Sequence, residues 1–252
     1  MLSAAHYGRA SMKASPQIAV PQIRLVRQKR MYEQLAEQIE TLIRVGDFAP
    51  GARLPAEREL AERVGVSRPS LREALIALET AGLIETRVGD GTYVRGDIPA
   101  GPVFPLSANQ DLGPGALEQF EARRALECAA AELAAQRAGT DEIDALAECL
   151  ARMTALVQSG GNPGVEHRSF HTGLADASHN GIIARAVRDL WRVRQGEMWN
   201  TLRRRIETPE SFRAGLVFRT RLIAALRAGD RAAARAEMET HFDRVGRHYF
   251  DP

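Results

Sequence analysis

Residues 54–75 read LPAERELAERVGVSRPSLREAL, a run that predicts two short helices joined by a tight turn. Leu60 and Val64 share one helical face, and Gly65 is a typical C-terminal residue for the first helix. Ser67 is a favourable N-cap for the second helix, whose apolar residues recur at helical spacing. Two helices placed around such a turn are typical of a helix-turn-helix.

The flanking segments extend this pattern into a winged helix-turn-helix. Before it, apolar residues at helical spacing predict a further helix that begins near Arg30 and stops at Gly46. After it, two β-prone runs over residues 83–88 and 92–94 flank a Gly-Asp-Gly tip, which is a strong hairpin signal. The order helix, helix, turn, helix, hairpin therefore predicts a winged module over residues 28–96.

The remaining sequence divides into an arm, a linker and a helical part. Residues 1–27 lack apolar periodicity and predict a flexible arm. Residues 97–115 are rich in Gly and Pro and predict a linker. Residues 116–252 predict six or seven helices in an all-α bundle, with one longer helix that carries both Trp191 and Trp199. The predicted fold class is thus mostly α, with a small β-hairpin wing in the N-terminal module.

Composition excludes several classes of protein. Of the 252 residues, 44% are hydrophobic and 26% are charged, which is typical of a globular chain with a core. No apolar run reaches the roughly 20 residues that span a bilayer, and no secretory signal opens the chain, so we expect a cytoplasmic protein without a membrane partner. Cys128 and Cys149 are too few for a disulfide framework and predict reduced, buried thiols. The net charge of +2 is too small to identify a partner.

Polar residues at the start of the second helix of the helix-turn-helix point to DNA. Leu71 and its apolar neighbours must face the core, so Arg68, Ser70 and Arg72 lie on other faces. A recognition helix presents its N-terminal residues to base edges in the major groove, where arginine can bind guanine O6 and N7. Arg58, on the preceding helix, is close enough to reach the same groove. The alternative is that these arginines are solvated surface charges paired with neighbouring glutamates.

Residues 30–95 resemble the winged-helix domain of GntR-type transcriptional regulators. The resemblance rests on PAERELA at 55–61, SR at 67–68, LREAL at 71–75 and GTYV at 91–94. It implies a homodimer on a short inverted repeat of double-stranded DNA. It also implies that the DNA contacts are Arg58, Arg68, Ser70, Arg72 and the wing tip at Gly89 and Gly91.

The helical part resembles the effector domain, called FCD, of the FadR branch of that family. The resemblance covers residues 116–249 and rests on segments such as FH at 170–171, HN at 179–180 and METH at 238–241. It implies that the domain dimerises and binds a small metabolite, commonly a carboxylic acid. Many members also hold a divalent metal through one Asp and three His. The corresponding positions in this chain are His167, His171, Arg219 and His241.

Two of those four positions differ from the metal-binding pattern, because His167 replaces the Asp and Arg219 replaces a His. His167 and His171 share one helical face at a spacing that can chelate zinc, and His241 could supply a third imidazole. Arg219 opposes a dication and suits a carboxylate, and Arg123 is a second candidate for that role. We therefore expect these five residues to bind an anionic effector and any metal to bind more weakly than in four-ligand relatives. Alternatively, His167 and His171 are hydrogen-bonded core histidines.

Three functions follow from these patterns. The favoured one is a ligand-responsive DNA-binding regulator, a repressor that a small organic or sugar acid releases. The second is a metal-dependent hydrolase fused to a DNA-binding head. Against it, Arg168 follows His167 where H-E-x-x-H hydrolases carry Glu, which leaves Glu166 as the nearby candidate base. The third is an architectural DNA-binding protein with a purely structural bundle. We expect a regulator and not an enzyme.

Overall fold

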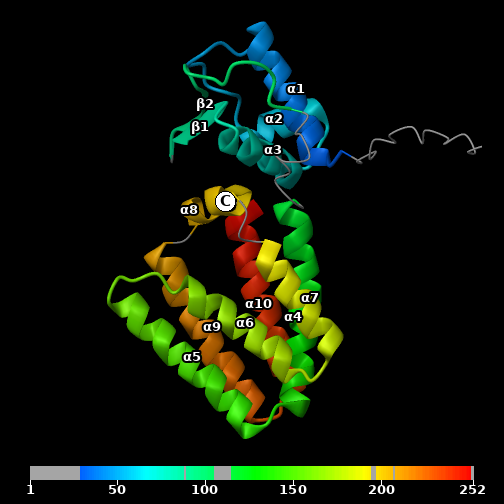
Figure 1. The fold of residues 1–252 in the computed structure, drawn as a ribbon, viewed down its shortest axis with the longest axis vertical. Helices are drawn as coiled ribbons and strands as arrows, with labels where there is room; N and C mark the ends of the chain where they lie inside the picture. The colour runs from blue at the N-terminus through cyan, green and yellow to red at the C-terminus, as the bar shows by residue number, and fades with distance from the viewer. Residues whose placement is uncertain (1–28, 88, 105–114, 194–196, 207, 251–252) are drawn as a thin grey trace, which may run out of the picture.

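The computed structural model describes residues 29–87, 89–104, 115–193, 197–206 and 208–250 (Figure 1). The predicted arm at residues 1–27 and the later part of the predicted linker lie outside these ranges. Within them the chain is helical apart from one β-hairpin, so the predicted fold class is confirmed. No helix in the described ranges is long and apolar enough to cross a membrane.

The N-terminal module contains three helices and the hairpin. Its elements are α1 (Met31–Val45), α2 (Glu57–Val64), α3 (Arg68–Thr80), β1 (Ile84–Arg87) and β2 (Gly91–Val94). Helices α2 and α3 are the predicted helix-turn-helix. The predicted N-cap is present, because the Ser67 hydroxyl oxygen accepts the Ser70 N–H at 3.2 Å.

The hairpin is attached to the segment that precedes α2. Strands β1 and β2 pair in antiparallel register, with Ile84 opposite Val94. The Leu54 N–H donates to the Thr92 carbonyl oxygen at 2.8 Å, which adds a short rung to the outer edge of β2. The wing is therefore held in place by the chain that leads into the helix-turn-helix.

Seven helices follow in the described part of the chain and form an all-α bundle. They are α4 (Ala116–Arg137), α5 (Thr140–Gln158), α6 (Gly164–Ala177), α7 (Gly181–Val193), α8 (Glu197–Ile206), α9 (Pro209–Arg227) and α10 (Arg231–Phe250). Helices α4 and α10 pack along each other, and α9 packs against α5 and α10 (Figure 1). The most deeply buried apolar side chains of the bundle include Phe170, Leu174, Leu222, Met238 and Phe242.

The prediction of one longer helix carrying both tryptophans is wrong. Trp191 lies on α7, which ends at Val193, and Trp199 lies on α8, which begins at Glu197. Figure 1 shows α8 lying across the end of the bundle, close to the N-terminal module, whereas α7 runs along the bundle. Gly196 stands between the two helices in the sequence, and glycine disfavours a continuous helix.

The first residues of the predicted linker are bound to α1. The buried Glu40 carboxylate accepts the N–H groups of Val103 and Phe104, each at 2.7 Å. Arg44, one turn further along α1, donates to the Pro99 carbonyl oxygen at 3.2 Å. Phe104 itself is only 4% exposed. Residues up to 104 therefore belong physically to the N-terminal module.

Candidate functional site

The surface that the sequence assigns to DNA carries Arg58, Arg68 and Ser70. The Arg58 side chain is 76% exposed and lies 3.4 Å from a Glu62 carboxylate oxygen. Arg68 is the first residue of α3 and is half-buried. The Ser70 hydroxyl lies 2.8 Å from that of Ser67 at the same helix start. An exposed ion pair such as Arg58–Glu62 contributes little to the free energy of folding, so the Arg58 guanidinium can leave Glu62 and bind a phosphate.

Arg72 is more enclosed than its place on the recognition helix predicts. Its side chain is 10% exposed, and its Nε and Nη2 both donate to Oε2 of Glu57 on α2, with Nε at 2.8 Å. The side chain lies back against α2 because this ion pair spans the turn between the two helices. The paired-charge interpretation therefore describes Arg72, whose guanidinium is held by Glu57.

Arg53 binds the backbone of the wing tip, a contact that the sequence did not predict. Gly89 and Gly91 flank the tip with backbone φ angles of 77° and 148°. The Arg53 guanidinium donates to the Asp90 carbonyl oxygen. A Cβ atom at Gly91 would lie 2.6 Å from Arg53 Nε. Glycine at this position thus permits both the backbone conformation and the close approach of Arg53.

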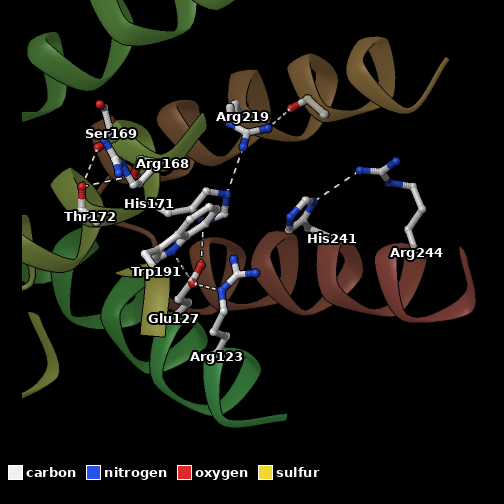
Figure 2. Close-up of polar contacts among 11 residues, drawn as sticks. Arg123, Glu127, Arg168, Ser169, His171, Thr172, Trp191, Arg219, His241 and Arg244 are labelled. Atoms are coloured by element: carbon white, nitrogen blue, oxygen red, sulfur yellow. Dashed lines mark hydrogen bonds and ion pairs between the residues drawn. The ribbon is translucent and has the colours of Figure 1, made fainter. Parts of the chain in front are cut away.

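Four of the five residues predicted to bind the effector lie together inside the bundle (Figure 2). Arg123 on α4, His171 on α6, Arg219 on α9 and His241 on α10 are each at most 6% exposed. His167 is half-buried one turn before His171, and the two ring centroids are 5.0 Å apart. The structure therefore brings the predicted residues to one place where four helices converge.

Glu127 lies at the centre of this cluster and was not predicted. Its carboxylate accepts hydrogen bonds from Arg123 Nε at 2.8 Å and from Trp191 Nε1 at 3.1 Å. It also contacts His171 Nδ1 at 2.5 Å. Burial opposes ionisation of Glu127, but Arg123 and His171 outweigh it and lower the pKa of this carboxyl. The spacing of four residues between Arg123 and Glu127 on one helix was the signal available in the sequence.

The hydrogen bonds of His171 define its tautomer. Arg219 Nη2 lies 2.9 Å from His171 Nε2, and a guanidinium can only donate. His171 Nε2 is therefore the acceptor, and Nδ1 carries the proton that is donated to Glu127. Burial lowers the pKa of His171 to about 4. Glu127 favours the charged form and raises this pKa, but Arg219 and Arg123 act in the same direction as burial. His171 is thus a neutral imidazole whose two nitrogen atoms are both engaged.

His241 is neutral as well. Burial lowers the pKa of His241 well below 6.5, and the nearby His171, Arg219 and Arg244 lower it further. Its ring stacks on Phe218 with centroids 4.0 Å apart, and Arg244 Nη2 lies 3.3 Å from its Nδ1. Three guanidinium groups, from Arg123, Arg219 and Arg244, therefore share a region with one carboxylate and two uncharged imidazoles.

The three histidines do not fit a metal site in this arrangement. Metal coordination needs a free ring nitrogen with its lone pair, and His171 uses Nδ1 as a donor and Nε2 as the acceptor from Arg219. A dication at Nε2 would also meet the fixed positive charge of Arg219. Among the residues that the structure describes, no group of three or more His, Cys, Asp or Glu side chains is placed to hold a metal ion.

Both tryptophans are buried, with different surroundings. Trp191 is 6% exposed and lies within the cluster, where the Arg123 guanidinium lies 4.2 Å from its ring centroid. Trp199 is 2% exposed, and its Nε1 donates to the Gln119 side-chain oxygen at 2.7 Å. Trp191 is therefore part of the candidate effector site, whereas Trp199 joins α8 to α4.

Comparison with known families covers both modules. The model described as "Bacterial regulatory proteins, gntR family" matches residues 31–94. The FCD domain model matches residues 118–244. The first range contains α1 to β2, and the second contains all of the buried cluster.

Similar proteins carry the names of regulators and not of enzymes. The Uxu operon transcriptional regulator of Escherichia coli K12 is 32% identical over 221 residues, which cover 86% of each chain. The Exu regulon transcriptional regulator of the same organism is 30% identical over 185 residues, covering 71% of this chain and 69% of that one. A solved structure of Streptococcus agalactiae GntR is 28% identical, covers 86% of this chain and 99% of that one, and has a TM-score of 0.46. The chain belongs to the GntR family of bacterial regulatory proteins, carries an FCD domain, and is a DNA-binding transcriptional regulator of the ligand-responsive type.

Proposed function

We propose that this regulator is a repressor that binds an inverted-repeat operator as a homodimer and is released when a small carboxylic acid binds inside its FCD domain. The proposal that the ligand is an acid is supported by the hydrogen bonding of one edge of the Arg219 guanidinium. Among the residues that the structure describes, its Nε is buried without a hydrogen-bond partner, and Nη2 on the same edge has one hydrogen-bond partner, the neutral imidazole of His171. That edge matches the two oxygen atoms of a carboxylate.

The charge balance of the cluster also favours an anion. Arg123, Arg219 and Arg244 supply three positive charges, and Glu127 supplies one negative charge, because His171 and His241 are neutral. An excess of buried positive charge is costly unless a negative partner compensates it. A sugar acid or hydroxy acid would supply that charge, together with hydroxyl groups for the surrounding polar atoms.

Binding of the acid would change the contacts between helices. A carboxylate that takes Nε and Nη2 of Arg219 displaces Nε2 of His171, which is now the acceptor for Nη2. His171 on α6 and Arg219 on α9 would then exchange their mutual hydrogen bond for contacts with the ligand. The acid therefore prefers one arrangement of these helices, which is the physical requirement for a response to ligand.

Calorimetric titration with D-glucuronate and with L-lactate, as a sugar acid and a hydroxy acid, tests the ligand site. We expect one of them to bind, Arg219→Ala to abolish the binding, and Arg219→Lys to restore only part of it, because lysine lacks the planar two-point geometry. Arg221→Ala, an exposed arginine on the same helix, is the matched control and should bind like the native protein. Unchanged affinity in both Arg219→Ala and Arg123→Ala would remove the carboxylate assignment.

The DNA half of the proposal rests on the helix-turn-helix. Arg68 and Ser70 stand half-buried in the first turn of α3, Arg58 is exposed on α2, and Gly89 and Gly91 shape a slim wing tip. A dimer places two such heads on two half-sites of an inverted repeat. The place of action would be the bacterial cytoplasm, which holds the chromosome.

Operator binding with and without acid separates this function from an architectural role. We expect a duplex selected from random sequence to contain an inverted repeat and to bind two chains, counted by sedimentation. The acid that binds in calorimetry should weaken this complex. An architectural protein would bind DNA equally well with and without the acid, and that result would contradict the repressor assignment.

A further inference from the structure

Glu73 connects the recognition helix to the effector domain. It follows Arg72 on α3, yet its carboxylate accepts the N–H of Leu117, the second residue of α4, at 2.5 Å. The N–H groups in the first turn of a helix lack partners within that helix, so Glu73 satisfies one of them from another module. The residue is 7% exposed, and burial raises its pKa to about 7.

The contact between Glu73 and α4 is tight. A Cβ atom at Gly115, the N-cap of α4, would lie 2.8 Å from Oε1 of Glu73. A side chain at position 115 would therefore push this carboxylate away from the Leu117 N–H. Gly115 permits the start of α4 to approach α3 closely.

Helix α4 continues from this contact into the candidate effector site. Arg123 and Glu127 lie on it, and Glu127 follows Leu117 by about 15 Å along the helix axis at 1.5 Å per residue. Both ends belong to one uninterrupted helix of 22 residues. A shift or rotation of α4 in the buried cluster therefore reaches its N-terminus, because an α-helix moves as a stiff rod over this length.

Helix α8 adds a second contact with the same recognition helix. Thr80, at the end of α3, lies 3.2 Å from the Thr201 hydroxyl on α8, and Thr201 is 6% exposed. Trp199 on α8 donates to Gln119, on the first turn of α4. The middle of α3, at Glu73, and its end, at Thr80, thus contact two helices that are hydrogen-bonded to each other. Figure 1 shows α8 and the start of α4 close to α3.

We infer that Glu73 is a positioning residue that couples the effector site to the recognition helix, by fixing α3 to the N-terminus of α4. This inference rests on the proposed function. Ligand contacts at Arg123 displace α4, the Leu117 N–H moves with it, and Glu73 carries the displacement into α3. Loss of the Glu73 contact then leaves both DNA binding and ligand binding in place but makes them independent.

A double-mutant cycle on operator affinity tests the coupling without any ligand. Arg123→Ala perturbs α4 within the cluster, and we expect it to change the operator Kd by at least about fivefold in the native background, within the usual range of coupling between sites. In the Glu73→Ala background the same substitution should leave Kd unchanged within about twofold. Glu73→Gln keeps an acceptor oxygen for the Leu117 N–H and should retain the fivefold effect.

Two matched variants exclude a purely structural role. Glu79, on the same helix, accepts the Thr86 N–H within the N-terminal module. Glu79→Ala removes this carboxylate without touching α4, so this variant should retain the coupling. Gly115→Ala perturbs the contact from the α4 side without any change in α3, and it should abolish the coupling even where Glu73→Ala does not fold. A fivefold effect of Arg123→Ala that persists in both Glu73→Ala and Gly115→Ala would overturn the inference, as would an absent effect in the native background.

Amide hydrogen exchange separates this inference from the proposed function. Arg123→Ala should change the exchange rates of the α3 amides in the native background and not in the Glu73→Ala background. This readout needs no DNA. A chain that binds no operator would refute the proposed function alone, whereas α3 amides that respond equally in both backgrounds would refute the coupling.

Discussion

The arginine residues of the N-terminal module differ in how far their guanidinium groups are open to DNA. The Arg58 side chain is 76% exposed, whereas that of Arg72 is 10% exposed and bound to Glu57. Arg68 stands at the start of α3, from which a recognition helix reads bases. These differences predict separate roles for the three residues.

We predict that Arg68→Ala costs about 1–3 kcal/mol per half-site and relaxes base preference at the position it reads. Arg58→Ala should weaken binding to all sequences alike and reduce the salt dependence, as expected for a phosphate contact. Arg72→Ala should also relax base preference, provided that DNA displaces Glu57 from its guanidinium. Gel-shift titrations on the selected operator and on scrambled DNA measure each effect. If Arg68→Ala and Arg72→Ala both keep the native affinity and specificity, the assignment of base reading to these two arginines is wrong.

A single substitution in the cluster should convert it towards a metal site. Arg219→His removes the fixed positive charge and the donor that occupies His171 Nε2, and it adds a further imidazole to the cluster that contains His171 and His241. We predict that this variant binds zinc at least about tenfold more tightly than the native chain, which corresponds to about 1.4 kcal/mol. Competition with a chromophoric chelator gives both affinities. Stoichiometric zinc that the native chain retains through dialysis would show that our assignment of weak metal binding is wrong.

The junction of α3 and α4 should make stability depend on pH. Burial raises the pKa of Glu73 from 4.5 to about 7, so between these values the folded protein keeps a proton that the unfolded chain has released. The free energy of unfolding should therefore fall as pH rises from about 4.5 to about 7, by about 3 kcal/mol at most from this group. Glu73→Gln should remove that contribution.

The measurement is the difference between the native protein and Glu73→Gln in urea unfolding across this pH range. A difference is needed because His171 and His241, whose pKa values are lowered, contribute the opposite slope over part of the range. Parallel curves for the two proteins would show that Glu73 does not titrate as its burial implies.

Across the whole molecule, the elements predicted best are those with local signals. The turn between α2 and α3 follows from Gly65 and Ser67, whose conformational and capping preferences act within a few residues. The hairpin follows from the Gly-Asp-Gly tip, and the family patterns placed four buried cluster residues correctly in one region. The turn and the hairpin required no knowledge of how distant segments pack, whereas the grouping of the four cluster residues came from the resemblance to the FCD domain.

The features that the sequence did not predict depend on contacts between distant segments. Arg72 is enclosed by Glu57, fifteen residues earlier, only after α2 and α3 have packed. Glu127 becomes the central acceptor of the cluster once α6 and α7 bring His171 and Trp191 to it. Helical periodicity places a residue on a face and leaves its partner on another helix undetermined.

The extent of the DNA-binding module can be tested with fragments. A fragment of residues 29–104 keeps the hydrogen bonds from Val103 and Phe104 to Glu40, whereas a fragment of residues 29–96 leaves this buried carboxylate without them. Loss of partners for a buried charged group is destabilising, by about 1–3 kcal/mol or more. We predict that the shorter fragment melts several degrees lower in a calorimetric scan. Equal melting temperatures would place the end of the module at residue 96.

The attachment of residues 99–104 to α1 bears on how such proteins are assembled in evolution. Recombination that joins a winged head to a new effector domain succeeds only where the crossover leaves both cores intact. A crossover just after the wing would separate Glu40 from the backbone that it binds, whereas one beyond Phe104 would not. Because the α1 residues and the 99–104 segment must be inherited together, chimaeras of this chain should be joined downstream of Phe104 and upstream of α4.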